Sequence, residues 1–276
     1  MDDTRTAALV EEIITGLREV IRRHRVTPAE YRSALRFLTE TVERGELPLL
    51  SDVLFEAVVD GVAQLGSEGT DTNVEGPFYV AGAPLLYADG GTPILPMRPE
   101  EPGDRLLFTG AVRSTAGAAL PSTMIDIWQA NGAGLYSRFA PDLPEWNLRG
   151  RIRCDADGNF AFITVVPAPY DIPQHPHTSR VLGLLGQEPH RPAHIHFKVH
   201  APNHRELTTQ VYFAGDPWLD HDVVGAAKPS LVTELQKATD TDSYGYTCRF
   251  DFVLAVESND QESASALLDF GSAEPG

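Results

Sequence analysis

Residues 191–199 read RPAHIHFKV, and this stretch decides what kind of fold the chain adopts. Successive side chains of a β-strand point to opposite faces of its sheet. His194 and His196 therefore share one face of a strand, whereas Ile195 and Phe197 lie on the other, apolar face. The pattern predicts a strand that packs its apolar face on a core and presents two imidazoles on the opposite side.

The histidine pair by itself allows two interpretations. Two imidazoles that converge from a rigid strand suit a metal ion. The plainer interpretation is an ordinary amphipathic strand whose histidines face outward. The nearest carboxylates are Glu188 and Glu206, and neither has a spacing that clearly places it on the same face as the histidines. This disfavours a site of two histidines and one carboxylate. A metal site here requires other ligands.

The chain before about residue 65 has the sequence pattern of helices. Between about Thr4 and Arg25 the apolar residues recur at three- and four-residue steps, which predicts an amphipathic helix whose apolar face needs a cover: Leu9, Val10, Ile13, Ile14, Leu17, Val20 and Ile21. Residues 27–30 read TPAE, a capping box that starts a second helix through about Arg44. Ser51 is expected to cap a third helix, which fades at residues 66–69.

The chain beyond Gly76 has a β-rich texture, with frequent proline and glycine and turn signals such as DGN at residues 157–159. The predicted strands are Leu106–Val112, Met124–Gln129, Phe160–Val166, Ala193–His200, Thr208–Phe213 and Arg249–Val256. Their spacing suits a β-sandwich or barrel. We therefore expect a mainly β protein in which an N-terminal helical segment, 1–75, precedes a β-sandwich domain, 76–257, and a disordered tail, 258–276.

The composition excludes several classes of partner. A net charge of −17 and a pI near 4.8 leave no basic stripe for nucleic acid or an anionic membrane surface. Cys154 and Cys248 lie in no metal-binding spacing, so a reduced, cytoplasmic setting is expected. The first residues lack the basic start and apolar core of a signal peptide, and no run reaches the ~20 apolar residues of a membrane span.

Two tyrosines lie at strand-to-loop transitions of the predicted sandwich. Tyr136 is found in GAGLYS, residues 132–137, and Tyr170 ends the run VVPAPY, residues 165–170. A single tyrosine in such a place more often packs with its hydroxyl hydrogen-bonded than binds a metal. The residues alone therefore leave the role of both tyrosines open.

A series of motifs between about Val10 and Ala255 resembles the intradiol ring-cleavage dioxygenases of the catechol 1,2-dioxygenase group. In chain order these motifs are EGPFYVAGAP (75–84), DIWQAN (126–131), GLYS (134–137), LRGR (148–151), DADG (155–158), PAPY (167–170), RPAHIHF (191–197) and LTTQ (207–210). The gaps of 34 residues between the two tyrosines and 24 residues from Tyr170 to His194 are similar to those of the family. So many motifs in one order make a chance similarity improbable.

The resemblance implies an iron(III) enzyme that uses O2 to open a catechol between its hydroxylated carbons, yielding a cis,cis-muconate. It assigns the metal to four residues: Tyr136, Tyr170, His194 and His196. It further implies that Tyr170 accepts a substrate proton, and that Arg191 and Gln210 handle the substrate. The spacing alone leaves the direction of the Arg191 side chain undecided, because Pro192 can redirect the strand.

The resemblance also nominates residues that contact the substrate, in the helical part and in the GPF loop: Leu49, Asp52, Val53, Gly76, Pro77, Phe78 and Val224. Some stretches, such as 95–99 and 165–173, look like chlorocatechol 1,2-dioxygenases, whereas 50–54 resembles hydroxyquinol 1,2-dioxygenases, whose product is maleylacetate. Asp52 is suited to a third ring hydroxyl or to a contact within its own helix. A second pair, His175 and His177, is expected in a solvated loop.

Family members pair through their N-terminal helices, so the resemblance implies a homodimer, and a phospholipid at the helical interface is compatible with it. Packing of the first helix on the sandwich of its own chain is the alternative.

Two other classes of function compete with the dioxygenase: a hydrolytic zinc enzyme that uses His194 and His196, and a non-catalytic β-sandwich binding protein. Two phenolates would give a ferric protein an intense colour, whereas zinc would leave it colourless.

Overall fold

The computed structural model describes residues 3–87, 91–239 and 244–257. The predicted tail, 258–276, lies outside these residues. Contacts within the chain group Glu46–Glu257 into one compact unit, while the first two helices belong to a second unit. The predicted domain boundary at residue 75 stays a prediction.

The first two helices are amphipathic, as predicted. Helix α1 spans Asp3–His24, and α2 spans Pro28–Glu43. The predicted capping box is confirmed, because the Thr27 N–H donates to Glu30 Oε2 at 2.7 Å and the Glu30 N–H donates to Thr27 Oγ1 at 3.3 Å. The apolar stripe of α1 is solvent-exposed in the chain, with Ile13 at 61% of its full accessibility.

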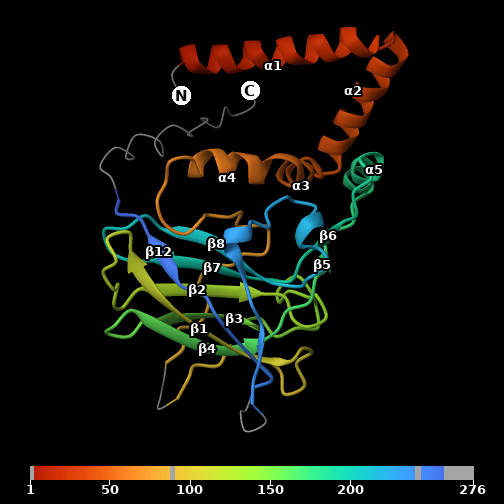
Figure 1. The fold of residues 1–276 in the computed structure, drawn as a ribbon. Coiled ribbons are helices and arrows are strands. Elements are labelled where there is room, and N and C mark those ends of the chain that lie inside the picture. Colours follow the sequence, from red (N-terminus) through yellow and green to blue (C-terminus); the bar gives the residue numbers. More distant parts are fainter. Residues whose placement is uncertain (1–2, 88–90, 240–243, 258–276) are drawn as a thin grey trace, which may run out of the picture. The chain divides into compact units, whose positions relative to one another are not determined.

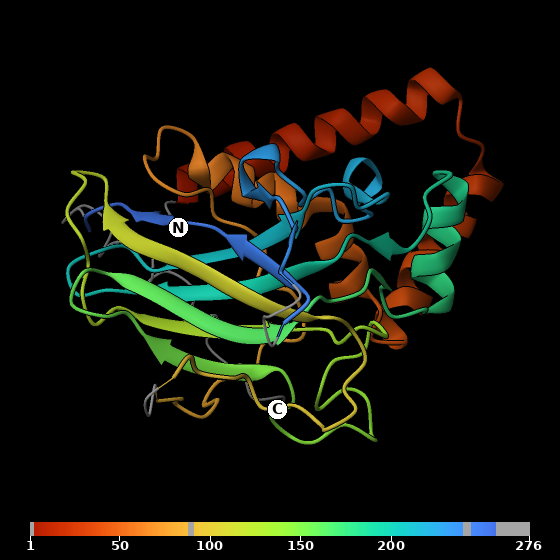
Figure 2. The same ribbon diagram turned by 60° about the horizontal axis from the view of Figure 1, so that its bottom comes forward.

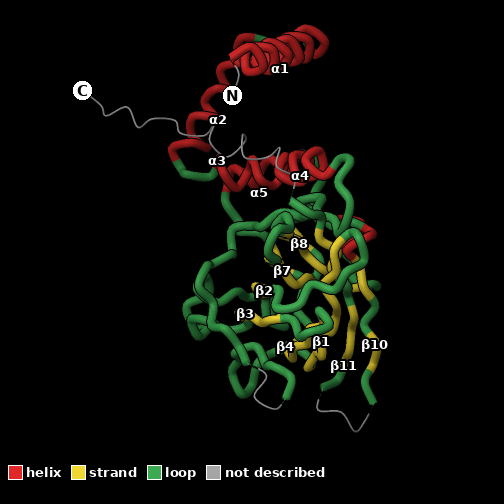
Figure 3. The backbone as a smooth tube through the Cα atoms, turned by 90° about the vertical axis from the view of Figure 1, so that its left-hand side faces the viewer, coloured by secondary structure: helices red, strands yellow, loops and turns green. Residues whose placement is uncertain are grey.

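The third helical segment begins earlier than predicted and changes its winding. Helix α3 spans Leu47–Ser51, a π-helical turn labelled η1 spans Asp52–Glu56, and α4 spans Ala57–Gln64. The prediction that Ser51 caps this helix is wrong, since Pro48 occupies the first turn and Ser51 continues the helix. Figures 1 and 3 show α3 and α4 on the side of the sandwich that carries β7 and β8. A π-turn inside a helix frequently marks a functional site.

The β-rich part forms two main sheets, which confirms the predicted sandwich. The first contains, in order, β10 (Gln236–Lys237), β11 (Tyr246–Arg249), β1 (Arg105–Ser114) and β12 (Phe252–Leu254), with β4 (Asn159–Val165) also paired to β1. The second contains, in order, β3 (Arg149–Arg153), β2 (Met124–Gln129), β7 (His194–His200), β8 (Leu207–Phe213) and β9 (Val232–Thr233). Figure 2 shows β1, in yellow, running between β12 and β4.

The core lies between the two sheets and is rich in aromatic rings. Phe108 of β1 and Phe162 of β4 stack with ring centroids 5.1 Å apart. Phe197 of the opposite sheet reaches Phe108 at 5.1 Å and Phe252 at 5.0 Å. Each of these four rings is fully buried. Burial of such large apolar side chains from both sheets drives the sandwich together.

The prediction of one continuous last strand, Arg249–Val256, is wrong. It is divided into β11 and β12, which both run parallel to β1. The interruption falls at Phe250–Asp251, where Asp251 Oδ1 accepts the N–H of Ala111 at 2.8 Å. Gly110 makes the close approach of this segment feasible, because a Cβ there would lie 2.0 Å from the Phe250 carbonyl oxygen.

The expectation of a solvated loop at the second histidine pair is wrong for His177. Helix α5 spans Pro176–Leu184, and His177 is buried in its first turn. The buried Glu46 carboxylate accepts the N–H groups of His177 at 2.9 Å and of Thr178 at 3.1 Å. A carboxylate in this position satisfies the otherwise unpaired N–H groups at the start of the helix.

None of the helices in the described residues has the length and the apolar composition needed to cross a membrane.

Candidate functional site

Strand β7 pairs with β2 on one side and with β8 on the other, so it lies inside its sheet. Ile195 and Phe197 point into the sandwich core and are fully buried. His194 and His196 lie on the opposite face, as predicted, but each is only 1% exposed. The interpretation of two outward-facing, solvated histidines is therefore wrong.

The two imidazoles face each other through their Nε2 atoms, which are 3.0 Å apart. Nδ1 of His194 donates to the Pro192 carbonyl oxygen at 2.7 Å, so Nε2 of this ring carries the lone pair. Burial and the nearby Arg191 guanidinium lower the pKa of His194 to about 3. Burial and His194 lower the pKa of His196 as well. Both rings are thus neutral at physiological pH, the form in which histidine binds metals.

The two predicted tyrosine ligands lie against this histidine pair. The rings of Tyr136 and Tyr170 have centroids 5.4 Å apart. Tyr170 lies 5.6 Å from the His194 ring, and Tyr136 lies 6.3 Å from the His196 ring. Tyr136 follows β2, and Tyr170 begins the short strand β5 (Tyr170–Asp171), so four residues from three separate segments meet at one place.

Two buried polar atoms of this group have no hydrogen-bond partner among the described residues: the Tyr136 hydroxyl and Nδ1 of His196. A buried polar atom without a partner is costly. Burial also raises the pKa of the Tyr136 and Tyr170 phenols, which would keep them protonated without a nearby cation. A trivalent cation supplies the charge that ionises phenols, and two phenolates with two imidazoles are a donor set that suits ferric iron. The residues therefore fit the metal that the resemblance implies.

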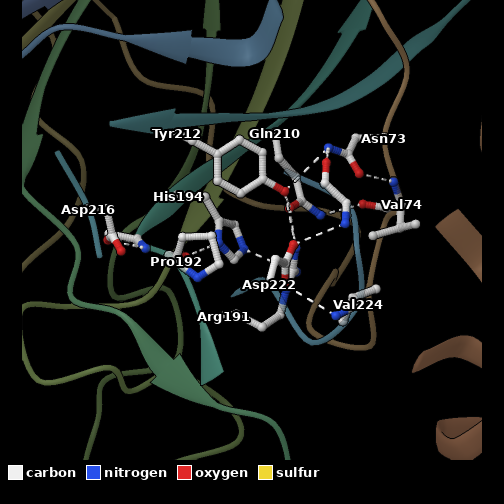
Figure 4. Close-up of polar contacts among 12 residues, drawn as sticks. Asn73, Val74, Arg191, Pro192, His194, Gln210, Tyr212, Asp216, Asp222 and Val224 are labelled. Atoms are coloured by element: carbon white, nitrogen blue, oxygen red, sulfur yellow. Dashed lines mark hydrogen bonds and ion pairs between the residues drawn. The ribbon is translucent and has the colours of Figure 1, made fainter. Parts of the chain in front are cut away.

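Arg191 lies beside the histidines and is held by three other side chains (Figure 4). Its Nη2 donates to Gln210 Oε1 at 2.9 Å and to the Tyr212 hydroxyl at 3.1 Å, and its Nε donates to Asp222 Oδ1 at 3.1 Å. Its Nη1 lies 3.4 Å from Nε2 of His194. The short strand β6 (His190–Arg191) ends before Pro192, and this interruption directs the guanidinium to the side of the histidines.

The ion pair of Arg191 and Asp222 is almost completely buried, with 4% and 2% of the two side chains exposed. Burial raises the pKa of the Asp222 carboxyl, but the Arg191 guanidinium lowers it further, and the net pKa lies below the usual value. Asp222 also accepts the N–H groups of Val224 at 3.3 Å and Ala226 at 3.1 Å. The carboxylate thus fixes both the arginine and the loop that carries Val224.

One cavity of the larger unit is lined by every residue that the resemblance nominates for substrate contact, together with Tyr170 and Arg191. The nominated residues are Leu49, Asp52, Val53, Gly76, Pro77, Phe78 and Val224. Val53 packs with Ile172 in an apolar cluster, and a Cβ on Gly76 would lie 3.7 Å from Cε1 of His196. The cavity wall is therefore mainly apolar and lies next to the histidine pair.

Several residues of the site were not predicted. Glu56, Val74, Ile172 and Pro173 also line the cavity. Glu56 stands four residues after Asp52, a spacing that puts two helical side chains on one face, so the sequence contained a signal for it. Tyr212 likewise stands two residues after Gln210 on β8 and shares its face. Asp222 is 31 residues from Arg191, and no local pattern points to it.

Comparison with known proteins gives matches along almost the whole chain. A family model described as Dioxygenase matches residues 74–256, and one described as Catechol dioxygenase N terminus matches residues 3–70. A chlorocatechol 1,2-dioxygenase of Rhodococcus opacus is 40% identical over 256 residues, which are 92% of this chain and 99% of that protein.

Solved structures agree with these matches. The crystal structure of 3-chlorocatechol 1,2-dioxygenase from Rhodococcus opacus 1CP has a TM-score of 0.84 at 36% identity, covering 92% of this chain and 99% of that one. The structure of hydroxyquinol 1,2-dioxygenase from Pseudomonas putida DLL-E4 has a TM-score of 0.83 at 30% identity, covering 93% and 94%. The fold is thus shared by proteins named for different substrates.

Replacing Asp222 by Asn should lower the free energy of unfolding by roughly 3–5 kcal/mol at pH 7, because it leaves a buried guanidinium without its anion. The folded-state pKa of Asp222 lies below its unfolded value of 3.8, so its stabilising effect is complete above that pH. The effect is lost as the pH falls through the lowered pKa. Urea unfolding of both proteins at several pH values measures this difference.

Asp220→Asn is the matched control, since Asp220 is an exposed carboxylate two residues away. It should leave the unfolding midpoint unchanged at every pH. Equal stability of the native protein and Asp222→Asn at pH 7 would contradict a stabilising role for the buried pair.

Proposed function

Because the chain belongs to the intradiol ring-cleavage dioxygenases of the catechol 1,2-dioxygenase group, we propose that it opens catechol or chlorinated catechols with O2 at a non-haem iron(III) site. The proposed iron ligands are Tyr136, Tyr170, His194 and His196. The observation that carries this proposal is the convergence of two neutral, buried imidazoles and two buried phenols, with the Tyr136 hydroxyl left without a partner. The expected products are cis,cis-muconates.

The four proposed ligands would neutralise most of the charge of a ferric ion. Two phenolates and two neutral imidazoles leave a net charge of +1 on a ferric site, which favours an anionic substrate over a neutral one. When bound, the iron would withdraw electron density from a chelated catecholate and make its ring open to attack by O2. Tyr170 lines the substrate cavity, so its phenolic oxygen is the group available to take a proton from the substrate.

Arg191 supplies fixed positive charge beside the substrate. It lines the cavity, and its contacts with Gln210, Tyr212 and Asp222 hold the guanidinium in one orientation. A cation that is already oriented stabilises the negative charge that develops on the substrate ring. The protein then does not have to rearrange during the reaction. We assign substrate-handling roles to Arg191 and Gln210 on this basis. The apolar wall of Leu49, Val53 and Val224 would exclude water from the ring.

A second candidate substrate is hydroxyquinol, which would yield maleylacetate. The observation that favours it is Asp52, a carboxylate on the cavity wall for which the described residues provide no hydrogen-bond or ion-pair partner. A carboxylate accepts a hydrogen bond from an additional ring hydroxyl, whereas it gains nothing from chlorine. The family itself speaks against the zinc hydrolase and the non-catalytic binding protein as alternatives.

We also propose that the chain forms a homodimer through its N-terminal helices. Helices α1 and α2 leave large apolar side chains exposed, including Leu17 at 59% and Val42 at 58%. Exposed apolar stripes of this size usually mark an interface. A phospholipid in that interface stays a prediction of the resemblance.

Light scattering at micromolar concentration should give about twice the chain mass of 30.1 kDa. Replacing Ile13 and Leu17 by Asp should give a single-chain mass, because charged side chains would then occupy the apolar stripe. A monomeric native protein would contradict the proposal.

Purified protein loaded with Fe(III) should be strongly coloured, because phenolate ligands transfer charge to ferric iron. Tyr170→Phe should weaken and shift the visible band and abolish turnover, while circular dichroism stays unchanged. Tyr87→Phe is the control, since this tyrosine is 69% exposed and outside the site. A colourless, folded protein that binds zinc in preference to iron would overturn the metal assignment.

Comparison of kcat/KM on catechol, 4-chlorocatechol and hydroxyquinol in one preparation tests the substrate. We expect catechol or 4-chlorocatechol to be the best substrate, and Asp52→Asn to leave both nearly unchanged. A preference for hydroxyquinol, lost by about 10–100-fold in Asp52→Asn, would establish the alternative instead. Asp220→Asn is again the control carboxylate variant.

A further inference from the structure

Arg149, the first residue of β3, is a buried cation that the mechanism above does not use. It is only 1% exposed. Its Nε donates to Ser137 Oγ at 2.7 Å, its Nη2 donates to the Ser137 carbonyl at 3.1 Å, and its Nη1 donates to the Phe78 carbonyl at 2.7 Å. All three acceptors are neutral oxygen atoms.

Within the described part of the chain, the Arg149 guanidinium forms no direct ion pair with a carboxylate. Among the residues that the structure describes, no Asp or Glu oxygen lies within ion-pair distance of this guanidinium, in contrast to Arg191 with Asp222. Burial lowers the pKa of Arg149 to about 10, so the group is still charged at neutral pH. A buried charge is costly unless an opposite charge lies near it. Asp126 is the carboxylate that acts on this guanidinium, from beyond ion-pair distance, so a phenolate at Tyr136 would add an opposite charge beside it.

The ring of Tyr136 lies beside this guanidinium. The guanidinium carbon of Arg149 lies 5.9 Å from the centre of the Tyr136 ring. The hydrogen bonds of Arg149 also fix the neighbours of this ring. Ser137 follows Tyr136 in the chain, and the ring of Phe78 stacks on Tyr136 with centroids 4.3 Å apart and planes 15° apart. One guanidinium thus bonds to the turn that carries Tyr136 and to the backbone of Phe78, whose ring covers Tyr136.

We propose that Arg149 is a positioning residue for the iron site, which holds Tyr136 in place through Ser137 and Phe78 and supplies the buried positive charge that balances its phenolate. This inference rests on the proposed iron(III) function and adds a residue to it. Because Phe78 lines the substrate cavity, Arg149 also joins the metal site to the cavity wall. Its role is indirect, since its three hydrogen bonds go to Ser137 and Phe78 and none goes to a proposed iron ligand.

The test uses Fe(III)-loaded full-length protein in a Tyr170→Phe background, where Tyr136 is the only remaining phenolate ligand and its visible band can be followed alone. Arg149→Gln removes the charge and should raise the energy of the phenolate electrons, so the band should move to longer wavelength. Loss of the guanidinium contacts should weaken iron binding by about 10–100-fold in competition with a chelator. Arg149→Lys keeps the charge and should keep the band near its original position, with weakened binding.

Arg151→Met is the matched control, because Arg151 lies on the same strand and donates to the Ala83 carbonyl at 2.6 Å, away from Tyr136. It should alter neither the band nor the iron affinity. If Arg149→Gln fails to fold, Arg149→Lys decides: a band shifted by the lysine variant overturns the charge assignment. Lower stability of the Arg149 variants with unchanged band and iron affinity would show a merely structural role. Absence of any visible band in the iron-loaded Tyr170→Phe parent and in the native protein would refute the proposed function itself.

Discussion

The pairing of β7 with β2 and β8 controls the rest of the site. Since β7 is bonded on both sides, its register is set, and its alternation divides the strand into a core face and a histidine face. A slip of one residue would send His194 and His196 into the aromatic core and Phe197 into the site. The burial of Phe197 against Phe108 therefore stabilises the sandwich and orients the two imidazoles at the same time.

Charge is arranged around the histidine face in two different ways. Arg191 is paired with Asp222, so its charge is largely compensated before any ligand arrives. Arg149 contacts only neutral oxygens, and the two imidazoles are neutral. Such a site is short of negative charge. Burial alone keeps the two phenols protonated, so the proposed metal ion would have to supply most of the charge that ionises them, and the buried guanidinium of Arg149 would add to it.

The sequence predicted well those features that repeat with a period. The alternation of β7, the stripe of α1 and the capping box at Thr27 each follow from one local pattern, and the structure has them where expected. The tyrosines were accessible only through the family resemblance, because they lie at the ends of loops where no period exists. Helix α5 was missed because its start is stabilised by Glu46, which is 131 residues away from His177. The break between β11 and β12 likewise depends on contacts with β1 rather than on local composition.

The fold by itself does not distinguish the two candidate classes of substrate. Structures of a chlorocatechol enzyme and a hydroxyquinol enzyme resemble this chain with nearly equal TM-scores, 0.84 and 0.83. The proposed metal ligands come from β7, β5 and the loop after β2, and Arg191 ends β6, all elements that belong to the shared scaffold. The π-turn η1 contributes Asp52, Val53 and Glu56 to the wall of the same cavity. Burial and the neighbouring Asp52 raise the pKa of Glu56. A ring substituent that donates a hydrogen bond would meet acceptors there, and a halogen would meet mainly Val53 and Leu49. Under the proposed function, changes in this one turn would alter the substrate preference and leave the four proposed iron ligands in place.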